Sequence, residues 1–168
     1  MRTEQRVTVV GVEEALRAAY EEHYVPLLRL CVLLCGDRQV AEDMVQDAFV
    51  KIAPRIGEVA PPQLGPYLRR VAVNLWKNRL RSLTRERRAR DRSVTTSPIA
   101  DASHEDRTLL RSAVLRLPRR QRACVVLRYY EDLPEREVAS LLGCSIGTVK
   151  SQTSRALARL RKEFDGEA

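Results

Sequence analysis

Residues 134–161 read PEREVASLLGCSIGTVKSQTSRALARLR, and this stretch decides the fold of the chain. Apolar residues recur at helical spacing on both sides of Gly143, which predicts two helices joined by a tight turn. A glycine directly after the last apolar residue of a helix is typical of a left-handed cap at the helix end. Ser145 then stands where its side-chain oxygen can accept a hydrogen bond from the free N–H groups that open the second helix.

Each of the two predicted helices has an apolar side that can pack against the other helix. Val138, Leu141 and Leu142 line the first helix, and the small side chain of Ala139 lets a second helix approach closely. The predicted apolar side of the second helix consists of Ile146, Val149, Ala156, Leu157 and Leu160.

The opposite face of the second helix carries hydroxyl groups and cations but no carboxylate. Small residues permit close approach to DNA, while hydroxyls and cations contact phosphates and base edges in the major groove. We therefore predict a helix-turn-helix whose second helix reads double-stranded DNA. The alternative is an ordinary helical hairpin with a solvated basic face, although a solvated face normally mixes the two charge signs. The predicted DNA-binding residues are Ser145, Gly147, Thr148, Lys150, Ser151, Ser154, Arg155 and Arg159.

The composition favours a helical protein with a polyanionic partner. The 168 residues include 30 Lys and Arg against 22 Asp and Glu, so the net charge is +8. Aromatic residues make up only 5% and glycines number only 7, which argues against a large sheet. No run of about 18 apolar residues is present, so we predict no membrane insertion. The N-terminal residues lack the long apolar core of a signal peptide, so we predict a cytoplasmic protein.

The four cysteines are predicted to be structural. Cys31 and Cys35 lie one helical turn apart, and His23 is near them in sequence, so a zinc or redox site is one interpretation. Each cysteine, including Cys124 and Cys144, instead stands among Leu and Val, where a free thiol behaves as a small apolar side chain. No closely spaced CxxC pair is present, so we predict neither a metal site nor a cofactor.

Residues 12–85 are predicted to form a first helical domain, after a loose N-terminus at residues 1–11. Pro26 predicts a kink or a break, because proline lacks an N–H donor and clashes with the preceding helical turn. Asp37 follows a glycine and can cap the next helix. The predicted helices of this domain span residues 12–34, 38–53 and 65–85.

The helix at residues 38–53 has an acidic outer ridge on a chain that is basic elsewhere. Its apolar stripe consists of Val40, Ala41, Met44, Val45, Ala48, Phe49 and Ile52, which leaves Glu42, Asp43, Gln46, Asp47 and Lys51 outside. A solvated face is the simpler interpretation, with Asp47 and Lys51 as an ion pair four residues apart. The alternative is a docking face for a basic partner.

The helix at residues 65–85 is basic and follows a constrained loop. Residues 54–66 contain four prolines and two glycines, which predicts that loop. The basic helix suits single-stranded nucleic acid, because cations follow the backbone while an aromatic ring stacks on an unpaired base. The sequence leaves open whether Trp76 stacks on a base or lies buried in the core. The polar side carries Arg69, Arg70, Asn74, Lys77, Asn78, Arg79 and Arg81.

Residues 86–104 lose all apolar periodicity and are rich in charged residues, Ser and Thr, which predicts a flexible linker. Two further helices, at residues 105–116 and 119–131, supply a second small core and lead into the helix-turn-helix. The second domain therefore spans residues 105–165. The predicted fold class is all-α, with two small helical domains joined by a flexible linker.

A resemblance to a known family is carried by three stretches: AEDMVQDAFVKI (41–52), YLRRVAVNLWKNRLRS (67–82) and LPRRQRACVVLRYYEDLPEREVASLLGCSIGTVKSQTSRALARLR (117–161). They resemble bacterial RNA polymerase sigma factors of the extracytoplasmic-function (ECF) group. That group belongs to the sigma-70 family and keeps only the second and fourth conserved sigma regions. The match covers about 150 residues in the right order, and its last stretch is highly specific.

The resemblance implies partners for the surfaces described above. The first stretch would grip the clamp helices of the largest polymerase subunit through Glu42, Asp43, Gln46, Asp47 and Phe49. The second would engage and melt the promoter −10 element through Arg69, Arg70, Asn74, Trp76, Lys77, Asn78 and Arg81. The third would read the −35 element with the DNA-binding residues of the helix-turn-helix. The polymerase flap and an anti-sigma factor that covers both domains are further partners that the resemblance implies.

The resemblance also gives roles to two connecting segments and includes two departures. The loop at residues 54–66 would capture a flipped-out −10 base, and the linker at residues 86–104 would thread toward the polymerase active-site and RNA-exit channels. Asn78 stands where many relatives have Asp. Ile146 stands where many have an acidic residue or proline, which leaves helix capping to Ser145.

A sigma factor is the predicted function, and the sequence offers less support for two other classes of protein. A stand-alone helix-turn-helix regulator would need a receiver or ligand domain, and residues 1–104 contain neither a βα repeat nor a pocket-like pattern. An enzyme acting on nucleic acid would need a carboxylate cluster for two metals or a nucleophile beside a base. His23 and His104 stand in unrelated contexts, so we predict no enzymatic activity.

Overall fold

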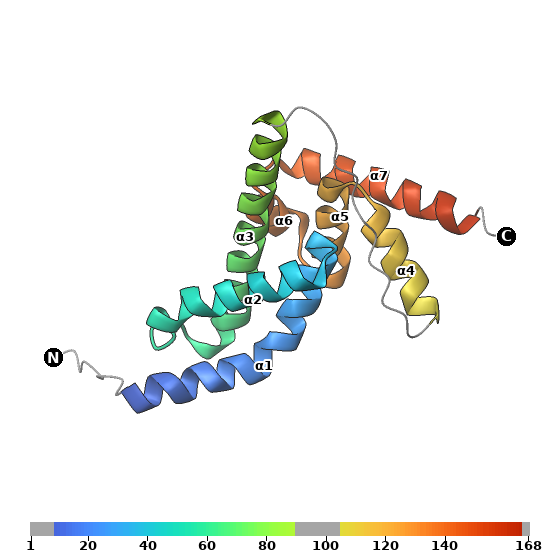
Figure 1. Ribbon diagram of the computed structural model, residues 1–168. Helices are drawn as coiled ribbons and strands as arrows, with labels where there is room; N and C mark the ends of the chain where they lie inside the picture. Colours follow the sequence, from blue (N-terminus) through green and yellow to red (C-terminus); the bar gives the residue numbers. More distant parts are fainter. Residues whose placement is uncertain (1–8, 90–104, 166–168) are drawn as a thin grey trace.

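Every regular element in the part of the chain that the structure describes, residues 9–89 and 105–165, is a helix. The computed structural model arranges these helices as two bundles in direct contact (Figure 1). The first bundle contains α1 (Val9–Cys35), α2 (Arg38–Ile52), the 3₁₀ turn η1 (Ala53–Arg55) and α3 (Pro61–Ala89). The second contains α4 (Glu105–Arg116), α5 (Arg119–Val125), the π-helical turn η2 (Val126–Tyr130), α6 (Glu135–Leu142) and α7 (Ile146–Asp165). The predicted all-α fold with two small helical domains is confirmed.

The first bundle begins and ends differently from the prediction. Helix α1 starts at Val9, so the last residues of the predicted loose N-terminus are helical. Helix α3 continues to Ala89, so residues 86–89 are helical rather than linker. These four residues are Glu, Arg, Arg and Ala, all strong helix formers that extend a helix without apolar periodicity. The other residues of the predicted N-terminus and linker, 1–8 and 90–104, lie outside the described residues.

Local sequence signals set the geometry of α1 and α2. Helix α1 contains Pro26 and is continuous, but Figure 1 shows it bending partway along its length, as a proline predicts. Gly36 follows with φ of +79°, and the Asp37 carboxylate then accepts a hydrogen bond from the Val40 N–H over 3.0 Å. The predicted cap of α2 is therefore confirmed.

The predicted loop at residues 54–66 is shorter than expected. Only residues 56–60 lie between η1 and α3, because α3 already begins at Pro61. Pro61 and Pro62 occupy the first helical turn, where a missing N–H costs nothing because it would have no partner in the helix. Pro66 lies inside the same helix. The proline-rich composition predicts a loop, but in the structure it marks the start of a helix.

The helix-turn-helix forms as predicted around Gly143, whose φ of 68° and ψ of 46° are left-handed. The backbone N–H groups of Gly143 and Cys144 both donate to the carbonyl of Ala139, at 2.9 and 3.1 Å. The Ser145 hydroxyl accepts a hydrogen bond from the Thr148 N–H over 3.1 Å and so caps α7. Val138 and Val149 are fully buried between α6 and α7.

The placement of Ile146 was predicted wrongly. Its side chain is 43% exposed instead of facing α6. Ile146 is the first residue of α7, directly after the cap, so it lies at the open end of the helix pair where α6 no longer covers it.

The two bundles share one continuous apolar core. Helix α1 packs against α5, and α3 packs against α6. The buried cluster runs without a break from Leu30, Leu34 and Leu68 of the first bundle to Cys124 and Leu127 of the second.

Candidate polymerase-binding and DNA-binding surfaces

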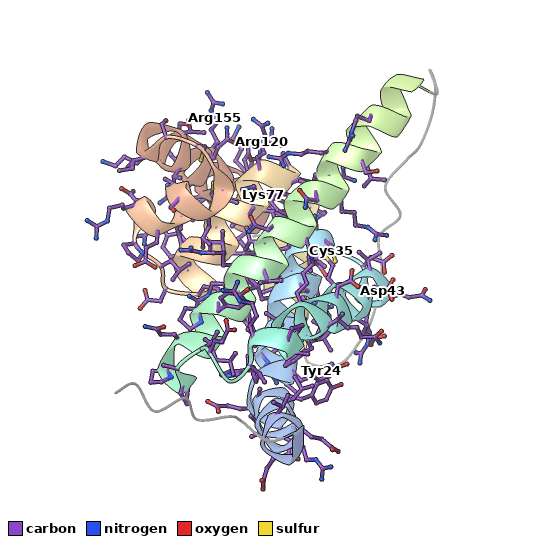
Figure 2. The ribbon with its side chains drawn as sticks, turned by 90° about the vertical axis from the view of Figure 1, so that its left-hand side faces the viewer. Tyr24, Cys35, Asp43, Lys77, Arg120 and Arg155 are labelled. Carbon is purple, nitrogen blue, oxygen red and sulfur yellow. The ribbon has the colours of Figure 1, made fainter. Side chains whose placement is uncertain are left out.

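The outer face of α2 is acidic and open to solvent. Asp43, Gln46 and Asp47 are exposed one turn apart along the helix, and Asp43 lies at the outer edge of the molecule in Figure 2. Glu42 is half-buried and pairs with Arg38 at 2.9 Å. In the described part of the chain, neither Asp43 nor Asp47 has a cation within 4.0 Å, so the predicted Asp47–Lys51 pair does not form. Two unneutralised carboxylates therefore remain available on this face.

Phe49 does not belong to this outer face. Its side chain is 7% exposed, and its ring packs against Tyr20 with the ring centroids 5.0 Å apart. The sequence had already placed Phe49 in the buried stripe, so its assignment to polymerase contact is corrected. Val50 was missed: it is 70% exposed and lies on the helix face of Asp43 and Asp47. The sequence contained a signal for this, because Val50 does not share the helical spacing of the buried stripe.

Trp76 is a core residue. Its side chain is 4% exposed, and its indole Nε1 donates a hydrogen bond over 3.1 Å to the carbonyl of Leu34 at the end of α1. A ring held in this way cannot stack on an unpaired base unless the core opens. Of the two interpretations that the sequence left open, burial is correct, and the assignment of Trp76 to −10 binding is corrected.

The polar side of α3 divides into exposed residues and residues held by the second bundle. Arg70, Asn74 and Asn78 are exposed, and the exposed Arg81 guanidinium donates to the Asn78 side chain over 3.3 Å. Arg69 and Lys77 instead reach across to the second bundle. The predicted nucleic-acid face is therefore partly occupied by the chain itself.

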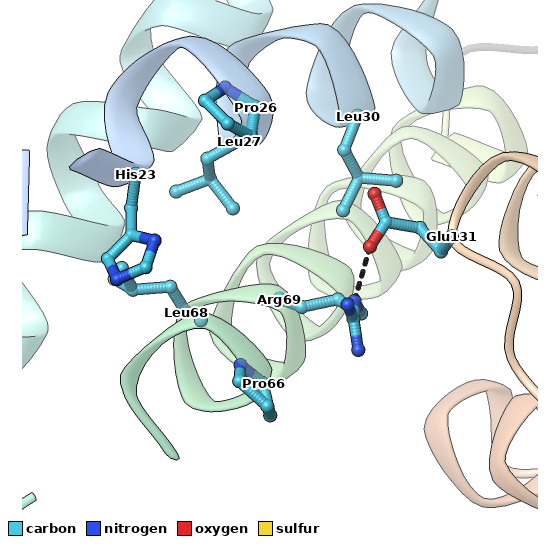
Figure 3. A pocket seen from close by; sticks show the side chains of 9 residues that line it. His23, Pro26, Leu27, Leu30, Pro66, Leu68, Arg69 and Glu131 are labelled. Atoms are coloured by element: carbon cyan, nitrogen blue, oxygen red, sulfur yellow. Dashed lines mark hydrogen bonds and ion pairs between the residues drawn. The ribbon is translucent and has the colours of Figure 1, made fainter. Parts of the chain in front are cut away.

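Arg69 forms an ion pair with Glu131, which follows η2. The Arg69 Nε and a Glu131 carboxylate oxygen are 2.5 Å apart, and both side chains are largely buried. Figure 3 shows this pair at the wall of a small pocket of about 170 Å³ whose lining also includes His23 and Pro66. The sequence had no signal that could pair two residues so far apart in the chain.

Lys77 donates a hydrogen bond to the backbone carbonyl of Leu141 in α6 over 2.9 Å. It lies between α3 and the second bundle in Figure 2, at a larger groove of about 270 Å³. Arg81, Arg120 and Thr148 line the same groove, so cations from both bundles gather there. Arg120 and Gln152, which also lines the groove, were not among the predicted site residues.

The exposed face of α7 carries the predicted DNA-binding residues. Gly147, Ser151, Ser154, Arg155 and Arg159 are exposed. Lys150 is exposed as well, and its Nζ lies 3.8 Å from the Glu135 carboxylate of α6. Thr148 is half-buried, and its hydroxyl lies 2.9 Å from that of Ser145. The structure therefore brings these side chains together on one face, which lies on the other side of the molecule from Asp43 in Figure 2.

The cysteine thiols have no redox or metal geometry within the described residues. Burial raises the pKa of Cys31 to about 12 and that of Cys124 to about 11, so both thiols are protonated at neutral pH. Burial also raises the pKa of Cys35, whose thiol donates to the Asp37 carbonyl over 3.0 Å. Over residues 9–89 and 105–165, no three His, Cys, Asp or Glu side chains meet as a metal site would require.

None of the described helices is both long enough and apolar enough to cross a membrane.

Comparison with known proteins finds two conserved regions, one in each helical bundle. The chain matches the family model described as Sigma-70 region 2 over residues 19–86 and that described as Sigma-70, region 4 over residues 107–160. It is 39% identical over 165 residues to the RNA polymerase sigma-E factor of Streptomyces avermitilis, covering 94% of this chain and 87% of that protein. It is 32% identical over 172 residues to the ECF RNA polymerase sigma factor SigL of Mycobacterium tuberculosis, covering 93% of each.

Two solved structures have similar folds. The sigma factor RpoE in complex with the anti-sigma factor NepR from Bartonella quintana has a TM-score of 0.66 and 25% identity, covering 94% of this chain and 98% of that chain. CnrH in complex with the cytosolic domain of CnrY has a TM-score of 0.58 and 22% identity, covering 94% and 96%. The stand-alone regulator is therefore not favoured. The chain belongs to the sigma-70 family and to its ECF group: it is a sigma factor that binds core RNA polymerase, recognises the −35 and −10 promoter elements and initiates transcription.

Proposed function

We propose that the three polar surfaces of this sigma factor bind different partners. The acidic face of α2 contacts the polymerase, the polar side of α3 contacts the −10 element, and the exposed face of α7 contacts the −35 element. The first domain, residues 12–85 in the sequence-based division, would supply the first two, and the second domain, residues 105–165, would supply the third. The α2 face is the observation that supports this proposal. Asp43, Gln46 and Asp47 are exposed there, and neither carboxylate has a cation within 4.0 Å among the described residues. Uncompensated carboxylates on a basic protein fit a basic partner surface.

The polymerase contact centres on Asp43, Gln46 and Asp47, with Glu42 at its edge. Val50 adds an apolar side chain to the same face. Charged groups around an apolar centre are a typical composition for a specific protein interface. The clamp helices of the largest polymerase subunit are the proposed partner.

The −10 contact is assigned to the polar side of α3, through Arg69, Arg70, Asn74, Lys77, Asn78 and Arg81. The segment at residues 54–66, of which residues 56–60 connect η1 to α3, leads into this helix and would hold the flipped-out base. Cations that follow the backbone of a single strand supply affinity without reading its sequence. Because Trp76 is buried, base stacking would come from another group.

The −35 contact is assigned to the N-terminal half of α7, which would enter the major groove. Gly147 gives close approach, and Lys150, Ser151, Ser154 and Arg155 reach phosphates and base edges. Thr148 and the cap residue Ser145 lie at the same helix end. Arg159 is further along and would contact phosphate.

The protein would have no catalytic activity of its own and would work in the cytoplasm. The solved RpoE structure contains an anti-sigma factor, and its fold is similar to this chain across both domains. An anti-sigma factor is therefore a proposed partner here as well. The polymerase flap is a further proposed contact of the second domain.

Co-purification with core RNA polymerase, together with duplex binding by the chain alone, tests this assignment. The expected result is stable association with core polymerase and no sequence-specific duplex binding without it. A chain that bound a specific duplex alone and did not associate with core polymerase would be a stand-alone regulator instead.

A further inference from the structure

The groove between α3 and the second bundle contains three cations and no carboxylate. Its volume is about 270 Å³, and Lys77 and Arg81 of α3 line it together with Arg120 of α5. Figure 2 shows Lys77 and Arg120 near one another where α3 meets the second bundle. None of the residues that line the groove is Asp or Glu. Positive charge is therefore concentrated in a concave part of the surface.

The described part of the chain neutralises none of these three cations. Within residues 9–89 and 105–165, no carboxylate oxygen lies within 4.0 Å of Lys77, Arg81 or Arg120. The Lys77 amine donates to the Leu141 carbonyl over 2.9 Å, and the Arg81 guanidinium donates to the Asn78 side chain over 3.3 Å. Both acceptors are uncharged, and each cation has several N–H donors. The groove therefore keeps its positive charge for an anion.

The rest of the lining suits a small molecule. Thr148 in the first turn of α7 and Gln152 one turn later add a hydroxyl and an amide. The first turn of α7 also brings the positive end of that helix dipole to the groove. Leu80 and Leu142 add apolar surface. A concave, largely apolar lining with a few convergent polar groups is typical of sites for small ligands.

The charge of the groove indicates a ligand with two adjacent phosphates. A terminal phosphate carries roughly 1.5 to 2 negative charges at neutral pH, so three cations outnumber one phosphate and match two. Guanidinium groups bind phosphate oxygens through two parallel hydrogen bonds, and a lysine amine binds them as a point charge. A single carboxylate has too little charge to neutralise the groove.

We propose that this groove binds a small molecule with a diphosphate group, supplied as inorganic pyrophosphate or as a nucleoside diphosphate. Lys77 and Arg81 hold the diphosphate from α3, and Arg120 holds it from α5. Arg120 is not among the residues assigned to polymerase or promoter contacts, so it distinguishes this site from those surfaces. The proposal goes beyond the function proposed above and does not require that α3 contacts DNA.

Isothermal titration calorimetry of the full-length chain with pyrophosphate, in a buffer without divalent cations, tests the site. We expect one ligand per chain and a dissociation constant below about 1 mM. Arg120→Ala should weaken binding about tenfold or more, because it removes one of the three cations. The matched control is Arg136→Ala, which removes an exposed arginine of α6 that does not line the groove. It should leave the affinity unchanged.

A second variant and a second ligand sharpen the test. Gln152→Glu keeps all three cations and places a carboxylate in the groove, so it should also weaken pyrophosphate binding. Far-UV circular dichroism checks that each variant is folded. Adenosine diphosphate is titrated in the same way. Tighter binding than that of pyrophosphate assigns the ligand to nucleotides, whereas equal or weaker binding assigns it to the pyrophosphate group alone.

Three results would overturn the proposal. The first is the absence of saturable binding of both ligands below about 1 mM. The second is an equal loss of affinity in Arg120→Ala and Arg136→Ala, because the anion would then only screen the net charge. The third is reduced promoter opening by holoenzyme with Arg120→Ala, measured by permanganate reactivity of unpaired thymines, because the groove would then belong to the promoter-binding surface.

The diphosphate site and the proposed −10 surface fail in different ways. Lys77→Ala combined with Arg81→Ala should lose pyrophosphate binding whether or not α3 contacts DNA. If this double variant loses pyrophosphate binding but opens promoters normally, the site stands and the −10 surface is wrong. If it binds pyrophosphate like the parent chain, the site is refuted.

Discussion

The side-chain amine of Lys77 lies 2.9 Å from the backbone carbonyl of Leu141, so a helix assigned to the −10 element contacts the first helix of a helix-turn-helix assigned to the −35 element. Together with the Arg69–Glu131 pair, this contact gives two basic residues of α3 a partner inside the chain. These two basic residues are therefore held between the two bundles, whereas Arg70 and Arg81 of the same helix are exposed.

Charge reversal on α2 should separate polymerase binding from folding. Asp47→Lys is expected to abolish association with core polymerase, because it places a cation against the proposed basic partner surface. Losing one partner of a buried interfacial charge pair typically costs about 2–5 kcal/mol. The measurement is a pull-down with purified core polymerase.

The matched control for this variant is Glu14→Lys, which makes the same charge change at an exposed site on α1. It should bind core polymerase normally. Full affinity of Asp47→Lys with unchanged circular dichroism would remove α2 from the polymerase interface.

Promoter opening should depend on the cations of α3. Lys77→Ala combined with Arg81→Ala is expected to leave duplex promoter binding by the holoenzyme intact and to reduce strand opening, because both cations would hold the separated strand. Permanganate reactivity of unpaired thymines measures opening. Arg85→Ala, an exposed cation further along α3, is the control. Normal permanganate reactivity in the double variant would refute the assignment.

Replacing Trp76 should destabilise the fold, because Trp76 is a buried core residue and not a DNA contact. Trp76→Ala is expected to lower the free energy of unfolding by about 3–5 kcal/mol, because it empties a core site and leaves the Leu34 carbonyl one donor short. Urea unfolding measures the change, with the exposed Asn74→Ala as control. A loss below about 1 kcal/mol would mean that the ring does not pack as the structure has it.

The two arginines of α7 should have different phenotypes. Arg155→Ala is expected to lower the use of particular −35 sequences, since losing a base contact costs about 1–3 kcal/mol at one position. Arg159→Ala should weaken all promoters alike and reduce the salt dependence of binding by about one unit of slope. Competition transcription over a randomised −35 library separates the two. A common scaling of every promoter by both variants would show that Arg155 reads no base.

The buried thiols should resist alkylation and should destabilise the fold only at high pH. Burial raises the pKa of Cys31 to about 12 and of Cys124 to about 11, above their unfolded value near 9. The stability linked to these thiols is therefore fully present below about pH 9 and is lost as pH rises toward 11 and 12. Mass-spectrometric mapping of iodoacetamide labelling at pH 8 should find these two cysteines the slowest to react. Rapid native-state labelling of either would contradict the burial.

The sequence could predict features that depend on nearby residues and missed features that depend on distant ones. Gly143 and Ser145 identified the turn of the helix-turn-helix, because caps are set by residues a few positions apart. The start of α3 was missed, because proline marks both loops and first helical turns and only packing distinguishes them.

The same distinction between nearby and distant residues applies to the candidate site. The exposed cations of α7 followed from helical periodicity, and so did the acidic face of α2. Neither the hydrogen bond from Trp76 to Leu34 nor the pairing of Arg69 with Glu131 could be predicted, because both join residues that only the tertiary fold brings together. These contacts decide which polar residues of α3 are free.

Run-off transcription with purified core RNA polymerase on genomic fragments, with the start sites mapped, measures directly whether this chain directs initiation through its α2 face. We expect the wild-type chain and core polymerase together to produce discrete start sites that neither produces alone. Asp47→Lys should abolish these products, and Glu14→Lys should leave them unchanged. Discrete start sites that persist with Asp47→Lys would rule out the α2 contact, and no promoter-specific product with the wild-type chain would rule out the sigma-factor function.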